Sequence, residues 1–512
     1  MPDLSLRPGE VRPQLIRGLL SRLPGSRLDG DPATPITGVT HDSRRVRTGD
    51  LYVARPGDVT HGIDYVADAV RAGAVAVLTD PDSFDLARSS GVNAVVVVDD
   101  PRAAMGPAAA WVYADPASAL LVFAVTGTNG KTTTAYLLDA GLRAAGLSTG
   151  LVGTIETRIA GEAMPSARTT PEATDLHALF AVMRERGVDA VAMEVSSHAL
   201  ALGRVNGLRF DQVAFTNLSQ DHLDFHHDMA SYFAAKSALF TPQRADHAVI
   251  CVDDEWGESL AASTAVPRIT TGVGARADWR RVEDVDDGTA GGRTVLLDPH
   301  GTRHELRCRL IGTVNLANAA LAYVTLVAAG IDPEAARAGI AGLSAVPGRM
   351  EQVAAGQSFS VLVDYAHTPE AVDRLLEEAR TLAGADARVV VVVGCGGDRD
   401  REKRPVIGAV AARQADLAIF TTDNPRSEDP LDILAAMTAG VTVDARAEVV
   451  VEPDRRAAIE LALDRATDGD VVIIAGKGHE QGQEVAGRVS PFDDRVVTRE
   501  ALAAQRPDRA SP

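Results

Sequence analysis

Short apolar runs alternate with longer segments of helical periodicity along most of the chain. Before residue 111 these runs predict the strands of a small α/β domain, at 36–39, 51–53, 75–78 and 94–98. A larger α/β unit follows, with strands expected at 120–125, 151–155, 190–194, 213–216 and 248–252. The alternation then resumes, with strands expected at 360–363, 389–393, 417–420, 448–451 and 471–474. This rhythm predicts mostly parallel sheets with helices on both faces.

The segments between these strands fit the same plan. Residues 132–145 predict a helix that ends at Gly146, and residues 315–329 predict another helix. Between 268 and 310 the chain is polar and glycine-rich with alternating runs, which predicts a small antiparallel excursion. Residues 501–512 predict a helix end followed by disorder. We therefore expect three domains, which are placed at 1–112, 113–346 and 347–512.

Length and composition agree with this division. A chain of 512 residues is long enough for about three domains, and 46% hydrophobic with 24% charged residues is ordinary globular material. No run of about 18 apolar residues occurs, which argues against membrane insertion. The N-terminal segment lacks the apolar region of a secretory signal. Cys251, Cys308 and Cys395 are too widely separated for a disulfide framework or a zinc site, so a cytoplasmic protein with reduced thiols is expected.

The chain carries 51 basic and 70 acidic residues, a formal net charge of −19. An acidic surface repels nucleic acid and anionic lipid, so neither is expected as a partner. If the substrates are themselves anionic, the positive groups that hold them must be local. Individual arginine and lysine residues inside motifs therefore carry more information than the overall balance.

The strongest chemical signal is a glycine-rich turn between the strand at 120–125 and the following helix. Converging backbone N–H groups and the helix dipole favour phosphate there, Lys131 reaches the outer phosphates, and Thr132 can ligate Mg²⁺. The usual phosphate loop begins with a glycine where Val125 stands, so this loop is a shortened variant. The sequence therefore predicts binding of a nucleoside triphosphate. The residues expected to contact ATP in this loop are Gly127, Thr128, Asn129, Gly130, Lys131, Thr132 and Thr133.

Three polar residues beyond this loop have open interpretations. Glu194 ends a predicted strand, where a carboxylate beside a phosphate loop is well placed for Mg²⁺, although it could equally cap a helix or face solvent. His222 follows another strand and could coordinate a metal, orient phosphate or be structural. Lys236 lies in a helical pattern and, taken alone, is typical of a solvated lysine.

The C-terminal half places further polar clusters after its strands, where ligands bind in such sheets. In Asp423-Asn424-Pro425-Arg426 the proline fixes a turn and leaves Arg426 able to bind a carboxylate, although an ordinary turn with an exposed arginine remains the alternative. The segment 394–401 is either a loose loop or a backbone nest for an anion. The segment 476–480 offers close backbone approach at Gly476 and, at Glu480, a carboxylate for an ammonium group.

Taken together, these motifs resemble the Mur ligase family of cell-wall peptide synthetases, over residues 41–480. The most specific matches are residues 126–132, 194–204, 217–224, 232–236, 364–369 and 423–426, which occur in the family's order. The resemblance implies an N-terminal domain for a uridine nucleotide, a central ATPase with a parallel sheet and a C-terminal Rossmann-like domain. It also implies that these domains close on one another, because the three sets of residues lie on different domains.

The activity implied by the resemblance is ATP-dependent amide formation through an acyl phosphate, with Mg²⁺. ATP would phosphorylate the D-glutamyl side-chain carboxylate of UDP-N-acetylmuramoyl-L-alanyl-D-glutamate, and the amine of meso-2,6-diaminopimelate would then displace phosphate. A carboxylate is a poor electrophile, and phosphorylation converts its oxygen into a leaving group. The protein would serve peptidoglycan precursor synthesis, in the cytoplasm and as a monomer.

Residue roles follow from the resemblance position by position. Lys131 and Thr132 would hold the ATP phosphates and Mg²⁺, with Glu194 and His222 as further groups on the metal side. In the family, the lysine that corresponds to Lys236 is carbamylated. Carbamylation would turn this cation into an anion that binds a second Mg²⁺. Further nucleotide contacts are implied at Asn318, Arg349 and Asp364. The UDP-sugar dipeptide would be held by Ser43, Thr169, Thr170, Ser196 and Arg204.

Amino-acid specificity is implied at Asp423, Asn424, Pro425 and Arg426, with Arg399 assisting. Diaminopimelate carries a distal carboxylate that lysine lacks, and Arg426 offers it a bidentate partner. Gly476 and Glu480 would hold the distal amino group. Lysine-adding relatives lack this arginine, which favours diaminopimelate.

Two residues depart from the family pattern, and three alternative functions remain. Leu202 stands where some relatives place a glutamine near the dipeptide, and Glu402 replaces a residue that is often small. A related ligase that adds L-lysine, or one resembling folylpolyglutamate synthetase, would share the ATPase core, but residues 41–44 and 423–426 argue against the latter. A non-catalytic protein that uses ATP as a switch would leave the Lys236 and Asp423 motifs unexplained.

Overall fold

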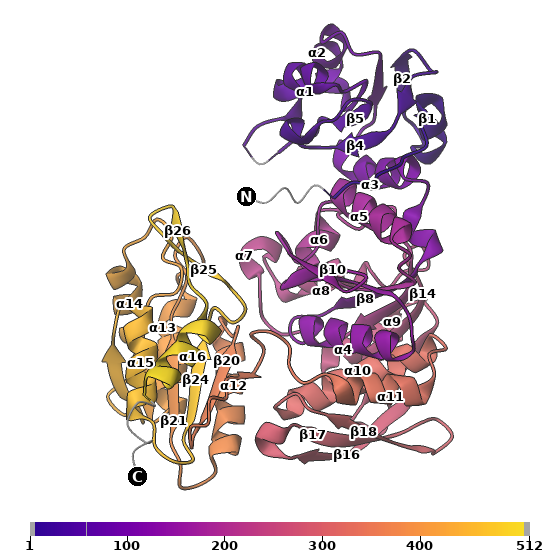
Figure 1. Cartoon of the computed structure of the whole chain (residues 1–512). Helices are drawn as coiled ribbons and strands as arrows, with labels where there is room; N and C mark the ends of the chain where they lie inside the picture. Colours follow the sequence, from indigo (N-terminus) through magenta and orange to yellow (C-terminus); the bar gives the residue numbers. More distant parts are fainter. Residues whose placement is uncertain (1–5, 58, 506–512) are drawn as a thin grey trace. The chain divides into compact units, whose positions relative to one another are not determined.

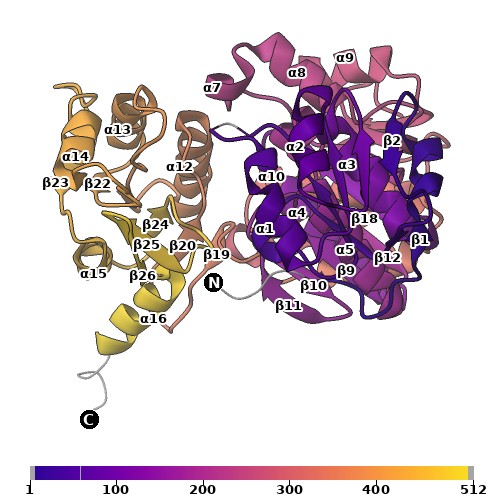
Figure 2. The ribbon, with the colours of Figure 1, turned by 90° about the horizontal axis from the view of Figure 1, so that it is seen from above.

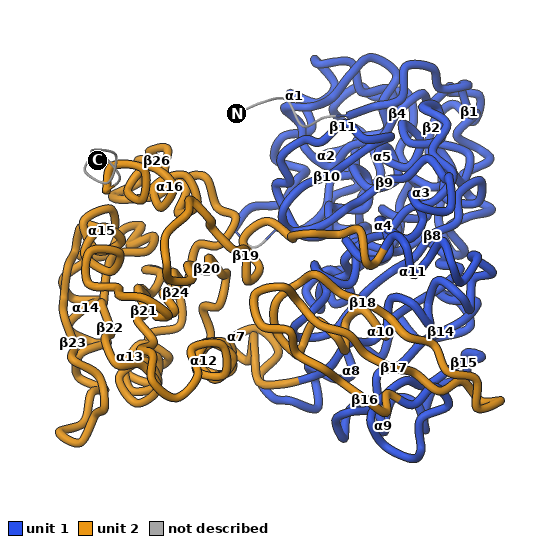
Figure 3. Tube along the Cα trace, turned by 60° about the horizontal axis from the view of Figure 1, so that its bottom comes forward, with its two compact units in different colours: residues 1–218, 228–280, 321–339 blue, residues 219–227, 281–320, 340–512 orange. Residues whose placement is uncertain are grey.

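The computed structural model describes residues 6–57 and 59–505, and Figure 1 shows the order of its helices and strands. The chain forms two compact units (Figure 3). The first consists of residues 1–218, 228–280 and 321–339, and the second of residues 219–227, 281–320 and 340–512. None of the helices in the described ranges is long and apolar enough to cross a membrane.

The N-terminal part of the first unit contains a five-stranded sheet of order β2-β7-β6-β5-β4. Its strands run parallel from β7 to β4, whereas β2 is antiparallel to β7. The strands are β2 (Arg27–Gly30), β4 (Gly38–Thr40), β5 (Asp50–Val53), β6 (Ala76–Thr79) and β7 (Ala94–Val97). They accompany helices α1 (Val66–Ala72), α2 (Phe84–Ser89) and α3 (Pro101–Val112) and the pair β1 (Gln14–Leu15) and β3 (Pro35–Ile36). The small α/β arrangement expected before residue 111 is confirmed.

A larger sheet follows in the same unit, with the order β11-β10-β9-β12-β8-β13-β14-β15. Strands β9, β12, β8, β13, β14 and β15 are parallel, and β10 and β11 extend one edge in antiparallel pairing. The strands are β8 (Leu121–Thr126), β9 (Thr149–Val152), β10 (Glu156–Ile159), β11 (Glu162–Pro165), β12 (Ala190–Glu194), β13 (Phe210–Phe215), β14 (Ala245–Cys251) and β15 (Arg268–Gly272). Because β8 lies between β12 and β13, the loop after it is surrounded by the carboxyl ends of its neighbours.

Helices pack around this parallel sheet. Apolar side chains of β8, β12 and β13 join those of the helix α5 in one continuous core. The helices of residues 131–342 are α4 (Lys131–Ala144), α5 (Ala173–Glu185), α6 (Ser197–Ala201), α7 (Leu223–His226), α8 (Met229–Ser237), α9 (Glu255–Ser263), α10 (Thr313–Ala328) and α11 (Pro333–Gly342). Of these, α7 belongs to the second unit, and α10 and α11 each cross the division between the units. Short 3-10 helices occupy Ile16–Arg22, Ser43–Arg45, Gly62–Tyr65, Pro81–Ser83, Pro116–Ala119 and Gly288–Ala290.

Two expected segments differ from the structure. The strand expected at 151–155 ends at Val152, because the Thr154 N–H donates to Glu194 Oε1 at 2.7 Å and turns the chain away. The prediction of antiparallel strands at 268–310 is correct for β17 (Gly292–Leu297) and β18 (Arg303–Cys308), which pair with each other. It is wrong for β15, which is parallel to β14, and β16 (Trp279–Asp286) begins by pairing parallel to β15.

The second unit contains a six-stranded sheet of order β19-β20-β24-β21-β22-β23. Strands β20 to β23 in this order are parallel, and β19 is antiparallel to β20. The strands are β19 (Glu351–Gln352), β20 (Ser360–Asp364), β21 (Val389–Val393), β22 (Leu417–Phe420), β23 (Glu448–Val451) and β24 (Val471–Ala475), with a hairpin of β25 (Gly482–Val485) and β26 (Arg488–Pro491). The mostly parallel sheet expected here is confirmed.

Both faces of this second sheet are covered by helices (Figure 2). In β21, Val391 packs with α12 (Pro369–Ala383), α13 (Lys403–Gln414) and α14 (Pro430–Thr438). The adjacent Val390 packs with α15 (Arg455–Arg465) and α16 (Asp494–Ala504) on the other face. Successive side chains of a strand point to opposite faces, so a continuous valine run is what two buried faces require. The expected helix end is confirmed to Ala504, and the disorder expected beyond it lies at 506–512, outside the described residues.

Candidate active site

The glycine-rich turn connects the buried strand β8 to helix α4, as the sequence predicts. Gly127 has a φ of +148°, and a Cβ there would lie 1.9 Å from Thr216 Oγ1. Only glycine fits this position, because both the backbone conformation and the neighbouring strand exclude a side chain. Gly130 caps the helix with a φ of +83°. The N-terminal N–H groups of α4 therefore begin immediately after the turn, which suits a phosphate.

The side chain of Lys131 folds back over the turn. Its Nζ donates to Gly127 O at 2.9 Å and to Thr128 O at 2.8 Å. The far side of the turn is held by Asn217, whose Oδ1 accepts from the Asn129 N–H at 3.0 Å. Thr216 Oγ1 also donates to Asn129 O at 2.6 Å. Thus the loop is anchored to β13 and is preorganised around the lysine.

Glu194 lies at the end of β12, beside Val125 of β8, and its side chain is buried. Thr132 Oγ1 donates to Glu194 Oε2 at 2.9 Å, and Thr154 contacts both carboxylate oxygens through its N–H and its hydroxyl, at 2.7 and 3.1 Å. The alternative of a solvent-facing acid is therefore wrong. The carboxylate and the threonine hydroxyl are oxygen donors of the kind that Mg²⁺ prefers.

In the described ranges, no three or more His, Cys, Asp and Glu side chains gather in a group that could hold a metal ion. Thr132 and Glu194 are the oxygen donors that could hold a magnesium ion beside the phosphate loop, and Mg²⁺ in proteins usually keeps phosphate and water ligands as well. His222 belongs to the second unit, where it has a φ of +54° and its Nε2 lies 3.4 Å from Asp221 Oδ2.

Lys236 is buried on α8, with only 1% of its surface exposed, so the interpretation as a solvated lysine is wrong. Its Nζ donates to Gly127 O at 2.6 Å and lies 4.6 Å from the centre of the Tyr232 ring. Tyr232 OH in turn lies 3.2 Å from Thr128 Oγ1. Two lysines of separate helices, Lys131 and Lys236, therefore converge on one carbonyl of the phosphate loop.

Four of the five residues expected to hold the UDP-sugar dipeptide form one cluster beside Glu194. Thr170 Oγ1 donates to Glu194 O at 2.9 Å and accepts from the Ser196 N–H at 3.2 Å. Thr169 Oγ1 lies 3.0 Å from Thr154 Oγ1, and Arg204 Nη1 donates to Thr170 O at 3.4 Å. This cluster and the start of α4 therefore meet at one residue, Glu194, through its backbone carbonyl and its carboxylate respectively.

Ser43, the fifth residue of this set, begins a 3-10 helix in the N-terminal sheet domain. Its neighbour His41 lies close to the larger sheet domain, since His41 Nδ1 is 2.9 Å from Thr174 Oγ1 of α5. Burial lowers the pKa of His41, which favours the neutral imidazole.

Glu172 holds the arginine of the cluster in place. Arg204 Nε lies 3.0 Å from Glu172 Oε1, and Arg168 contacts the same oxygen. Burial alone would raise the pKa of Glu172, but nearby positive groups, Arg204 foremost and Arg168 with it, outweigh burial and lower the pKa below its ordinary value. The carboxylate therefore stays ionised and fixes a positive group near the proposed dipeptide residues.

Three expected nucleotide residues lie in the second unit. Asp364 ends β20, and its two carboxylate oxygens accept from the Met350 and Ala366 N–H groups at 2.8 and 2.7 Å. Desolvation nevertheless raises the pKa of Asp364. The Arg349 guanidinium lies 4.7 Å from the Tyr365 ring centre, in a cation–π arrangement. Asn318 is buried on α10, where its Nδ2 donates to Asn315 Oδ1 at 3.0 Å.

The turn 423–426 follows β22 and lies against the glycine-rich loop that follows β21. Arg426 Nη1 donates to Gly397 O at 2.6 Å, and a Cβ on Gly397 would lie 1.9 Å from Pro425 O. Arg426 has a φ of +52°, an unusual conformation for a non-glycine residue. Arg399 is exposed on the same glycine-rich loop. The interpretation of this segment as a loose loop is wrong, because its backbone is packed against the arginine turn.

A salt-bridged network fastens the two loops together. Arg404 donates to both Glu428 oxygens, at 3.0 and 2.8 Å, and to Gly396 O at 3.4 Å. The Asp398 N–H donates to Glu428 Oε1 at 2.6 Å. Hydrogen bonds from Arg404 and from this N–H lower the pKa of Glu428 to about 2.

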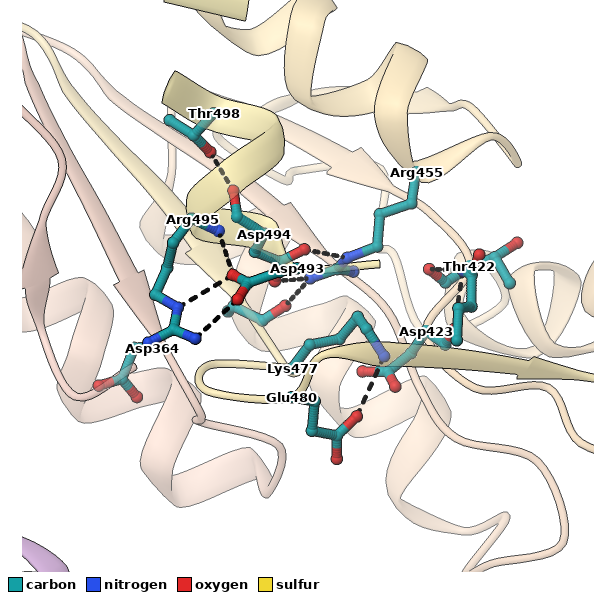
Figure 4. Close-up of polar contacts among 12 residues, drawn as sticks. Asp364, Thr422, Asp423, Arg455, Lys477, Glu480, Asp493, Asp494, Arg495 and Thr498 are labelled. Carbon is teal, nitrogen blue, oxygen red and sulfur yellow. Dashed lines mark hydrogen bonds and ion pairs between the residues drawn. The ribbon is translucent and has the colours of Figure 1, made fainter. Parts of the chain in front are cut away.

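Gly476 and Glu480 bracket the same region from the end of β24. Gly476 has a φ of +111°, and a Cβ there would lie 2.5 Å from Asp423 Oδ2. Glu480 Oε2 accepts from Asn424 Nδ2 at 2.8 Å. Figure 4 shows Asp423 and Glu480 with Lys477 beside them. The structure thus brings together the expected residues from three separate strand ends, including two carboxylates that suit an ammonium group.

Several contacts in these sites escape sequence reasoning. Thr154 lies within a segment that the sequence predicts to be a strand, so no contact of its side chain is expected. Lys477 lies between two glycines, where the sequence predicts close approach of the backbone rather than a side-chain contact. Thr216 and Asn217 lie directly after a strand of the parallel sheet, and Asn217 begins one of the segments that match the family, but neither signal predicts their contacts with Asn129. Of the two departures from the family pattern, Leu202 caps the C-terminus of α6 and Glu402 directly precedes α13.

Three family models match the chain in order. They are the Mur ligase family catalytic domain at residues 35–112, the Mur ligase middle domain at 125–326 and the Mur ligase glutamate ligase domain at 348–478. A relative from Streptomyces avermitilis, named UDP-N-acetylmuramoyl-L-alanyl-D-glutamate–2,6-diaminopimelate ligase, is 52% identical over 97% of this chain and 98% of its own length.

Other similar proteins carry the same name. The one from Geobacillus thermodenitrificans is 42% identical, over 96% of this chain and its full length. A solved structure so named is 31% identical, covers 95% of this chain and 99% of its own, and has a TM-score of 0.66.

Proposed function

Since the chain belongs to the Mur ligase family, we propose that it joins the D-glutamyl side-chain carboxylate of UDP-N-acetylmuramoyl-L-alanyl-D-glutamate to an amino group of meso-2,6-diaminopimelate, using ATP. The observation that carries this proposal is the similarity to relatives of that name over nearly the whole chain. The enzyme is an ATP-dependent carbon–nitrogen ligase of peptidoglycan precursor synthesis that releases ADP and phosphate.

The reaction has two chemical steps. A carboxylate oxygen of the D-glutamyl group attacks the γ-phosphorus of ATP, so that an acyl phosphate forms and ADP leaves. The uncharged amine of diaminopimelate then adds to the acyl carbon, and the tetrahedral species expels phosphate and loses a proton. Phosphate charge must be neutralised in both steps, which we assign to Lys131 and to the N–H groups at the start of α4.

We assign the magnesium site to Thr132 and Glu194, since these two oxygen donors touch each other beside the phosphate loop. Magnesium, when bound, would neutralise charge on the transferring phosphoryl group. The hydroxyl and N–H of Thr154 keep the carboxylate of Glu194 oriented. His222 remains a proposed further group on the metal side.

We propose that Lys236 is carbamylated. Its uncharged amine would add to CO₂ and lose a proton, which gives an anion at the end of the side chain. The observation in favour is that Lys236 and Lys131 both converge on Gly127 O, so replacing one cation by an anion relieves repulsion there. A carbamate would also supply oxygen atoms for a second Mg²⁺.

Substrate binding divides between two sets of residues. For the UDP-sugar dipeptide we propose Thr169, Thr170, Ser196 and Arg204, which adjoin Glu194, together with Ser43. Further nucleotide contacts are proposed at Asn318, Arg349 and Asp364. For diaminopimelate we propose Arg399, Asp423, Asn424, Pro425, Arg426, Gly476 and Glu480.

The chemistry of the second set fits a dibasic, diacidic amino acid. The guanidinium of Arg426 would bind the distal carboxylate, which lysine lacks, and Gly476 and Glu480 would bind the distal ammonium group. We further propose that the enzyme is cytoplasmic and monomeric, with domains at 1–112, 113–346 and 347–512.

The test is phosphate release from ATP in the presence of Mg²⁺ and UDP-N-acetylmuramoyl-L-alanyl-D-glutamate. Meso-diaminopimelate, its L,L isomer and L-lysine are added in parallel. Release with the meso compound alone is expected. Release with lysine instead would keep the ligase and contradict the assigned specificity, whereas no release with any amino acid would contradict the proposed reaction.

A further inference from the structure

The chain uses arginine almost wherever it needs a cation. Of its 51 basic residues only four are lysines, namely Lys131, Lys236, Lys403 and Lys477. Arginine and lysine differ in shape and in hydrogen-bonding geometry, so a lysine retained against such a bias marks a place where a compact ammonium is required. Two of the four serve the phosphate loop. Lys477 has no role in the reaction described so far, although it lies beside the proposed diaminopimelate residues.

Lys477 is completely buried, with an exposed fraction of 0%. Its Nζ donates to Glu480 Oε2 at 3.0 Å (Figure 4) and to Asn424 Oδ1 at 3.1 Å, the latter residue not being labelled there. Asn424 Nδ2 donates to the same Glu480 oxygen at 2.8 Å. The three side chains therefore form a closed triangle, in which one carboxylate oxygen receives two donors.

A separate, fully buried ion pair fixes the backbone next to this triangle. Arg455 and Asp494 are both fully buried, with Arg455 Nη2 2.7 Å from Asp494 Oδ2. The same guanidinium nitrogen donates to Ala475 O at 2.9 Å, immediately before Gly476 and Lys477. Buried charges are tolerated only when they are paired and hydrogen-bonded, so the base of Lys477 has little freedom to move.

On the basis of the proposed function, we infer that Lys477 is a positioning residue that sets recognition of the distal amino group of diaminopimelate. Lys477 and Asn424 occupy Glu480 Oε2 and thereby direct the other carboxylate oxygen, Oε1, toward the ligand. The carboxylate then receives the ligand ammonium in one orientation. A guanidinium at 477 would not fit the fully enclosed site of an ammonium.

The experiment compares two amino acids on the full chain, with ATP, Mg²⁺ and the UDP-sugar dipeptide present. One is meso-diaminopimelate, and the other is L-2-aminopimelate, which keeps both carboxylates but lacks the distal amino group. The variant is Lys477→Met, which preserves length and removes the charge. We expect kcat/KM for diaminopimelate to fall by roughly 30-fold or more, mainly through KM, and kcat/KM for aminopimelate to change by less than about threefold.

The matched control is Arg456→Met, which removes one positive charge from an exposed position of α15 in the same unit. It should leave the preference for diaminopimelate unchanged. Equal losses with both amino acids in Lys477→Met would overturn the inference, because a merely structural role would affect both alike. If Lys477→Met does not fold, as judged by circular dichroism, Glu480→Gln must lower the same preference, and an unchanged preference there overturns the inference.

Failure of the proposed function gives a different result. In that case the wild-type chain itself releases no phosphate with diaminopimelate, and both proposals fall. Failure of the inference alone leaves a wild-type enzyme that is active and prefers diaminopimelate, beside a Lys477→Met variant with the same preference.

Discussion

Thr132 Oγ1 donates a hydrogen bond of 2.9 Å to Glu194 Oε2, which connects the first turn of α4 to the end of β12. The two residues are 62 positions apart in sequence, yet they meet because β12 and β8 pair in parallel with Glu194 beside Val125, and α4 begins directly after the loop that follows β8. This contact brings a hydroxyl and a carboxylate together next to a phosphate loop. It gives the first prediction.

Glu194→Gln should lower kcat/KM for ATP by roughly 100-fold or more and raise the Mg²⁺ concentration needed for half-maximal activity. The amide retains the shape of the side chain but loses the negative charge that would bind the metal. Phosphate release measured across a Mg²⁺ titration checks this. Glu162→Gln, at an exposed ion pair on β11, is the matched control and should behave as the wild type. An unaltered Mg²⁺ requirement in Glu194→Gln would remove Glu194 from the metal site.

Lys236→Ala should reduce turnover by roughly 100-fold, while nucleotide still protects the protein against thermal unfolding. The direct measurement is ¹³C NMR after exposure to ¹³C-bicarbonate, which should give a carbamate signal in the wild type and none in the variant. Lys403→Ala is the comparison for the signal, because it also removes one of the four lysines. A wild-type spectrum without a carbamate signal, from active enzyme, would refute the modification.

Arg426→Ala should raise KM for diaminopimelate by roughly 100-fold and change KM for ATP little, because the guanidinium would contact only the distal carboxylate. Initial rates at varied concentrations of each substrate separate the two effects. Arg446→Ala, at an exposed ion pair with Asp416, removes the same charge from the surface of the same unit. Equal weakening for ATP and diaminopimelate would count against the assigned role.

Glu428 predicts a pH effect on stability. Its pKa is lowered from 4.5 to about 2 by hydrogen bonds from Arg404 and from the Asp398 N–H. A lowered pKa in the folded state means that the ionised form stabilises the fold, fully above pH about 4.5, and that this stabilisation is lost as the pH falls toward about 2. The wild type should therefore unfold at a higher temperature than Glu428→Gln at neutral pH.

The difference between these two melting temperatures should narrow as the pH drops below about 4.5. Differential scanning calorimetry at several pH values measures it. A difference that stays constant from pH 7 to pH 3 would show that ionisation of Glu428 does not stabilise the two loops. Glu460→Gln controls for the general effect of removing a negative charge, since among the described residues no ion pair comparable to that of Glu428 joins Glu460 to these loops.

The sequence predicts a structural feature correctly where the residues that form it are close together in the chain. The phosphate loop was predicted from an apolar run, two glycines and a helix start, and the structure has a strand, a turn and a helix at those places. The valine run of β21 likewise revealed a strand buried on both faces. Such patterns are local, so periodicity alone can find them.

The missed contacts depend on pairing between distant segments. Thr154 touches Glu194 only because β9 and β12 are adjacent in the sheet, and nothing in the residues around Thr154 announces that neighbour. Burial of Lys236 was missed for the same reason, because helical periodicity does not show what α8 packs against. The order of strands in a sheet is a non-local property that a single sequence seldom reveals.

The seclusion of the lysines has a consequence for covalent labelling. Lys236 and Lys477 are buried, and Lys131 and Lys403 are half-buried, so none of the four resembles the freely accessible surface amines of ordinary proteins. Reagents that acylate amines usually report on a protein's exterior. On this chain acylation of the folded protein would be confined to Lys131 and Lys403 among the lysines, so protection of Lys131 by nucleotide would report occupancy of the phosphate loop, whereas labelling of Lys236 or Lys477 would report unfolding.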